Sequence, residues 1–143
     1  MESEKYWRKV FYLLHRVIIQ KILKSFIFGY TDSVCLVDGI KMMPELEGTF
    51  SNRWLSTMTI DPNLIQATPY EIIDALNDAN IEARPVWKPL HMQPLFTDCP
   101  FYAHEENNIV SEELFATGIC LPSDTKMTVE EQQHVINIIL ENM

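Results

Sequence analysis

Two capping boxes constrain the fold of this chain most tightly, because they fix where two helices begin. Thr68 is followed by proline and then, three residues after the threonine, by Glu71, and Thr128 stands at the same spacing before Glu131. In such a box each of the two side chains satisfies a backbone N–H group that the first helical turn leaves without a partner. Apolar residues recur at spacings of three and four after each box, so both segments are predicted to be helices with one buried face.

Short apolar runs that end at proline or glycine are predicted to be strands, at 52–60, 81–86 and 119–121. Pro85 cannot donate a ladder hydrogen bond, so its strand is expected at an edge of the sheet or to end there. Ser111 is expected to cap a further short helix that ends at Gly118. The order predicts an α+β fold, a small sheet of about three mainly antiparallel strands packed with helices.

Residues 1–37 differ from the rest in charge and pattern. Apolar residues over 4–28 recur at helical spacing and predict an N-terminal amphipathic helix that Gly29 ends. Positions 1–30 hold six basic and two acidic residues in a chain whose net charge is −9. Charge asymmetry of this kind often marks a boundary.

We therefore divide the chain into an N-terminal helix and connector of uncertain origin, 1–37, and a domain, 38–143, with residues 31–50 expected to be irregular. Three interpretations of the N-terminal helix stay open. It packs against the core or an interface, it lies on anionic lipid as a basic amphipathic helix, or it is foreign to the rest of the chain.

Composition and motif searches argue against several classes of protein. The net charge of −9 argues against nucleic acid, which is bound through Lys and Arg. Three cysteines without metal spacing indicate a reducing compartment, and we expect a cytoplasmic protein without disulfides. No apolar run approaches the roughly 20 residues that span a bilayer. Glycine-rich phosphate loops, zinc motifs and nucleophile elbows are absent from the sequence, so no catalytic or metal residue is assigned.

The run of residues 84–91 is unusual for a structural loop. Its two prolines stiffen a stretch with four side chains that end in polar groups, a guanidinium, an indole, an ammonium and an imidazole. Loops of this kind are common at binding sites. On the structural alternative, Trp87 belongs to the core and Arg84 pairs with an acid. On the same alternative, Lys88 is a solvated charge and His91 is a histidine with its hydrogen bonds satisfied. The residues alone leave both interpretations open.

Four stretches resemble the C-terminal domain of the DegT/DnrJ/EryC1/StrS sugar aminotransferases. They are SNRWLSTMTID at 51–61, TPYEIIDALNDANIEARP at 68–85, IEARPVWKPLHMQPLF at 81–96 and SEELFATGICLPSDTKMTVEEQQHVINII at 111–139. The resemblance begins near Asp38 and follows the family's own order. It implies the C-terminal, small domain of a fold-type I transferase. Such enzymes use pyridoxal phosphate to move an amino group from glutamate to a nucleotide-linked keto-sugar, as in the biosynthesis of cell-surface polysaccharides and glycans.

The same resemblance implies that the chemistry lies elsewhere in the family. There the cofactor lysine, the aspartate at the pyridine nitrogen and the phosphate-binding residues belong to a large N-terminal domain with no counterpart in these 143 residues. No cofactor-binding residue is therefore assigned, and no pyridoxal phosphate is expected bound to this chain. We expect a C-terminal fragment that is inactive alone, and whether the chain counts as an enzyme stays open.

The small domain helps to shape the sugar-nucleotide pocket of the family. By resemblance, His91 and Trp87 would face the sugar or its nucleotide, and Arg84 and Lys88 would offset phosphate charge. Asn52 and Arg53 fall in the family's Ser-Asn-x-Trp segment and are weaker substrate-binding candidates.

Two non-catalytic functions are alternatives to that of an aminotransferase fragment. One is a nucleotide-sugar binding module, and the other is a protein-interaction module. Surface that the family's large domain would cover is expected to be exposed here. Exposed apolar surface favours self-association, so a homo-oligomer is expected.

Overall fold

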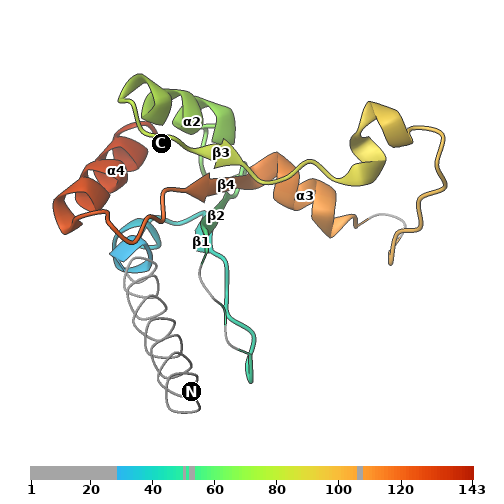
Figure 1. The fold of residues 1–143 in the computed structure, drawn as a ribbon, viewed down its shortest axis with the longest axis horizontal. Helices are drawn as coiled ribbons and strands as arrows, with labels where there is room; N and C mark the ends of the chain where they lie inside the picture. The colour runs from blue at the N-terminus through green and yellow to red at the C-terminus, as the bar shows by residue number, and fades with distance from the viewer. Residues whose placement is uncertain (1–28, 50, 52–53, 106–107) are drawn as a thin grey trace, which may run out of the picture.

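The structure is a computed structural model that describes residues 29–49, 51, 54–105 and 108–143. A four-stranded antiparallel sheet lies at its centre in the order β1-β2-β4-β3 (Figure 1). The strands are β1 (Ile40–Met42), β2 (Ser56–Ile60), β3 (Arg84–Pro85) and β4 (Gly118–Leu121). The predicted α+β fold is confirmed, with four strands in place of about three.

The additional strand is β1, which lies in the segment that was expected to be irregular. Ile40 pairs with Ile60, and Met42 pairs with Met58, so the strand continues the buried face of β2. The backbone turns before β1 at Gly39, whose φ of +98° is a conformation that glycine adopts at little cost. A strand of three residues has too few positions to show an alternating pattern, which is why the sequence did not reveal it.

The two helices with capping boxes form as predicted, as α2 (Pro69–Asp78) and α4 (Val129–Glu141). In the first box the Glu71 carboxylate accepts a hydrogen bond from the backbone N–H of Thr68 at 2.7 Å, which lowers the pKa of Glu71 below its ordinary value. The two helices pack against each other and form the core with the sheet, through buried residues that include Ile72, Leu76, Val135 and Ile139. None of the helices in the described ranges is both long and apolar enough to cross a membrane.

Three predicted boundaries are wrong. The strand expected at 52–60 begins only at Ser56, where its pairing with β4 starts. The other two boundaries each have a local cause. The strand expected at 81–86 is reduced to β3, because the chain leaving α2 is still tied to that helix. Asn80 has a φ of +59°, and the Ile81 N–H donates to the Leu76 carbonyl at 2.9 Å. The helix α3 (Val110–Thr117) begins before Ser111, and no side chain caps it. The edge position of β3 and the end of α3 at Gly118 are confirmed.

The residues before β1 contribute to the core. Residues 29–34 are helical, so the prediction that Gly29 ends a helix is wrong. This glycine permits close packing instead, since a Cβ atom there would lie 2.5 Å from Gln132 Oε1 on α4. Tyr30 and Val34 are fully buried. The predicted helix over 4–28 lies outside the described residues, and the division of the chain at residues 37 and 38 stays a prediction.

Residues 87–105 lead away from the sheet and residues 108–109 lead into α3, and together they are called the arm of the domain (Figure 1). Its regular structure in the described residues is two short 3-10 helices, η1 (Leu90–Met92) and η2 (Pro94–Phe96). The arm carries apolar side chains that are largely exposed, including those of Leu95 and Tyr102. No residue of η1 or η2 is buried, so these two helices have no core of their own.

Candidate functional site

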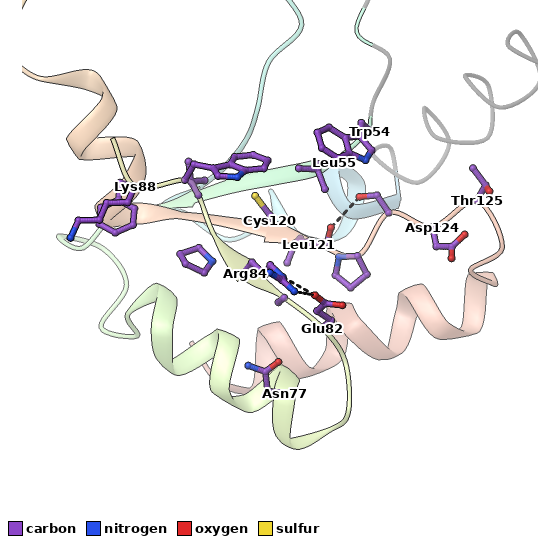
Figure 2. A pocket seen from close by; sticks show the side chains of 17 residues that line it. Trp54, Leu55, Asn77, Glu82, Arg84, Lys88, Cys120, Leu121, Asp124 and Thr125 are labelled. Carbon is purple, nitrogen blue, oxygen red and sulfur yellow. Dashed lines mark hydrogen bonds and ion pairs between the residues drawn. The ribbon is translucent and has the colours of Figure 1, made fainter. Parts of the chain in front are cut away.

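A cavity of about 1090 Å³ opens at the β3 edge of the sheet (Figure 2). Its apolar floor includes Leu55, Cys120 and Leu121. Three of the residues predicted to bind substrate line it, namely Arg84, Trp87 and Lys88. The structure therefore brings half of the predicted site together on one surface.

Strand pairing explains why these side chains share the cavity. Arg84 pairs with Cys120 across β3 and β4, and side chains at paired positions point to the same face of a sheet. The Val86 N–H donates to the Gly118 carbonyl at 3.1 Å, which continues the pairing one residue beyond β3. The next residue, Trp87, is among the residues that line the cavity.

Trp54 is a site residue that sequence reasoning missed. It falls within the strand predicted at 52–60, but it precedes β2, lines the cavity and is 68% exposed. Its ring lies beside that of Trp87, which is 66% exposed, with 6.3 Å between centroids and 36° between planes. The sequence signal for Trp54 is its place in the family's Ser-Asn-x-Trp segment, directly after the candidates Asn52 and Arg53.

The charged residues of the cavity are not equally available to a ligand. The Arg84 Nε–H donates to Glu82 Oε1 at 2.7 Å, and the same two side chains form an ion pair. Both side chains are exposed, so this pair stabilises the fold by at most about 1 kcal/mol. Lys88 lies at one end of the cavity and Asp124 at the other (Figure 2). An anionic ligand would therefore be favoured at the Lys88 end.

One wall of the cavity is the Leu-Pro-Ser segment at 121–123, and three hydrogen bonds hold it. Ser123 Oγ accepts from the backbone N–H of Ser56 at 2.7 Å and donates to the Leu121 carbonyl at 3.1 Å. The hydroxyl of Tyr30 donates to the Pro122 carbonyl at 3.1 Å. The wall is thus tied both to β2 and to the buried helix before β1.

Cys120 is the potential nucleophile in the described lining, and its environment argues against that role. Burial raises the pKa of its thiol, although a hydrogen bond with Thr57 acts in the opposite direction. A thiol reacts as the thiolate, so this cysteine is a buried apolar group of the floor. The described residues also contain no group of three or more His, Cys, Asp or Glu side chains that could hold a metal ion.

The remaining predicted site residues do not join this group. His91 lies on the arm and is not among the residues that line the cavity. Its Nε2 atom lies 2.8 Å from Glu112 Oε1 and its ring stacks on Phe101 at 3.7 Å, so its side chain is only 16% exposed. Asn52 and Arg53 lie outside the described residues.

Comparison with known proteins supports the resemblance found in the sequence. The model of the DegT/DnrJ/EryC1/StrS aminotransferase family matches residues 30–140. EpsN of Bacillus subtilis (strain 168), which is named as a pyridoxal phosphate-dependent aminotransferase, is 50% identical over 111 residues. That match covers 78% of this chain and 28% of EpsN. The chain therefore spans less than a third of the length of this relative.

Solved structures share the fold at low sequence identity. DesV of S. venezuelae has a TM-score of 0.73 and is 16% identical, over 90% of this chain and 33% of its own. DesI, solved in the presence of its TDP-sugar product, has a TM-score of 0.73 and is 14% identical, over 85% of this chain and 30% of its own. The match to the family model, which covers more than half of the sequence, shows that this chain belongs to the DegT/DnrJ/EryC1/StrS aminotransferase family.

Proposed function

We propose that this chain provides the substrate-side wall of an aminotransferase that acts on nucleotide-linked keto-sugars. The observation that carries the proposal is the cavity in which Arg84, Trp87 and Lys88 meet. Its volume is of the order of the sites that hold small ligands, which range from about 300 to 1,000 Å³. The TDP-sugar in the structure of DesI supports a nucleotide-sugar as the ligand class.

The residues of this cavity do not suit pyridoxal phosphate, the family's cofactor. When bound, the cofactor supplies the electron sink for amino-group transfer. A lysine that holds it is usually buried or placed beside another cation, but Lys88 is exposed. The cavity meets α2 near its C-terminal end, at Asn77, where the helix carries partial negative charge that disfavours a phosphate.

We therefore propose that the cofactor is held by a part of the enzyme that these 143 residues do not include. The chain alone would then be unable to transfer an amino group. The prediction that it binds no pyridoxal phosphate is open to a direct check by absorbance. A lysine-bound cofactor band that survives dialysis of the purified chain would contradict it.

The proposed role of Lys88 leads to a binding prediction. We expect the chain to bind UDP-glucose or dTDP-glucose weakly, and Lys88→Ala to weaken that binding by about fivefold, as for an exposed ion pair. Lys41→Ala is the matched control, since Lys41 is also exposed but lies on β1, outside the cavity. Titration followed by NMR chemical shifts measures both. If neither UDP-glucose nor dTDP-glucose binds at millimolar concentration, the proposed function is overturned.

Self-association through exposed apolar surface is a further proposal. The arm is the part of the described surface that favours it, because Leu95 is 84% exposed and Tyr102 is 87% exposed. Sedimentation velocity over a range of concentrations should show a species larger than a monomer, and Leu95→Glu should reduce its amount. A strict monomer at the highest concentration would contradict this expectation.

A further inference from the structure

The pair formed by Trp54 and Trp87 is the least explained feature of the cavity. The two side chains come from segments that precede β2 and follow β3, so only the folded sheet brings them together. Each ring exposes about two thirds of its surface, and both line the same cavity (Figure 2). An indole usually gains stability by burial, so two large exposed rings side by side indicate a contact that a ligand completes.

The backbone around Trp87 suits a platform rather than a mobile loop. Pro85 and Pro89 restrict the chain on both sides of it, and the hydrogen bond from Val86 to Gly118 fixes the residue just before it. A ring held in this way loses little conformational freedom when a ligand stacks on it. A nucleobase is flat and can stack on such a ring through its π-face, so it is the part of a sugar nucleotide that we place against the two indoles.

The charged residues around the two tryptophans would interact differently with the two ends of such a ligand. Glu82 is already paired with Arg84, and Asp124 lies at the end of the cavity opposite Lys88 (Figure 2). A phosphate would be repelled by the Asp124 carboxylate and attracted by the Lys88 ammonium, whereas the charge of Glu82 is offset by Arg84. A nucleotide consequently fits in one direction, with its phosphates toward Lys88 and its flat base on the indoles.

We propose that Trp54 and Trp87 form a stacking platform for the nucleobase of the sugar nucleotide. This inference rests on the proposed function, because it assigns one part of that ligand to one part of the same cavity. Arg84 is then paired with Glu82 rather than in direct contact with a phosphate. The base contributes binding affinity through its π-face, so uracil and thymine are both accepted.

The test compares a ligand that has a base with one that lacks it. UMP and glucose 1-phosphate each carry a phosphate monoester, and only UMP can stack. We expect Trp54→Leu and Trp87→Leu each to weaken UMP binding between about fivefold and 150-fold, the range typical of stacking on one aromatic side chain, and to leave glucose 1-phosphate binding unchanged. Trp87→Phe keeps a ring and should retain most of the affinity for UMP.

Control variants keep the result interpretable. Tyr102→Leu removes an exposed aromatic ring outside the cavity and should change neither affinity. Circular dichroism establishes that each variant is folded. Equal loss of UMP and glucose 1-phosphate affinity, or no loss of UMP affinity in either tryptophan variant, would overturn the stacking platform while sugar-nucleotide binding stands. If neither UDP-glucose nor dTDP-glucose binds the unmodified chain, the proposed function itself fails.

Discussion

Gly118→Ala is expected to lower the free energy of unfolding by about 3 kcal/mol, the upper part of the usual range for overpacking a core. Gly118 is the first residue of β4 and is fully enclosed between α3 and the residue after β3. A Cβ atom there would lie 2.5 Å from Val86 Cγ2 and closer still to the carbonyl oxygen of Leu114. Its φ of −98° is open to any residue, so the cost is steric rather than conformational. Urea denaturation of the two proteins measures the difference.

Two further variants separate the causes of this loss. Val86→Ala in the Gly118→Ala background removes the side-chain clash but leaves the Leu114 carbonyl, so it should restore only part of the stability. Gly48→Ala introduces a methyl group that meets no atom within 4 Å, at a φ of +75°, and should cost about 1 kcal/mol through backbone conformation alone. A loss at Gly118 no larger than the loss at Gly48 would contradict the steric explanation.

Gly118 also connects the core to the proposed site. Its carbonyl accepts the hydrogen bond from Val86, the residue before Trp87. A methyl group at position 118 would also press against the side chain of Val86. The binding of UMP should therefore weaken in Gly118→Ala even where the variant is still folded.

Features set by neighbouring residues were the ones that the sequence predicted well. Thr128 has Glu131 at the third position of its helix, and the capping box forms. Ser111 was expected to cap α3 by itself, without a capping box, and the helix begins one residue before it. The pairing of Arg84 with Glu82 was also accessible, since residues two apart on an extended chain share a face.

Features that depend on distant partners could not be predicted in this way. The meeting of Trp54 and Trp87 requires the register of β2 on β4 and of β3 on β4, which no local pattern contains. The same holds for His91, whose contact with Glu112 depends on how the arm returns to α3. The family resemblance identified the segment around residues 84–91, whereas only the structure separates the cavity-lining residues from the histidine on the arm.

Tyr30→Ala is expected to destabilise the whole described domain by about 3–5 kcal/mol, the usual cost of removing a large aromatic ring from a core. The ring of Tyr30 is fully buried among residues that belong to the sheet, α2 and α4. Its hydroxyl also holds the Pro122 carbonyl in the wall of the cavity. If residues 1–37 were separate from the domain at 38–143, this substitution would leave the stability of the domain nearly unchanged, so thermal unfolding of the variant tests that boundary.

Two matched variants divide the effect into packing and hydrogen bonding. Tyr30→Phe keeps the ring and loses only the bond to Pro122, so we expect it to cost about 1 kcal/mol. Tyr102→Ala removes an exposed tyrosine and should change stability by less than about 0.5 kcal/mol. The hydroxyl of Tyr30 supports the wall of the cavity through the Pro122 carbonyl. Tyr30→Phe should therefore weaken sugar-nucleotide binding even under conditions in which the variant is fully folded. Unchanged binding in that variant would mean that the bonds of Ser123 hold the wall without it.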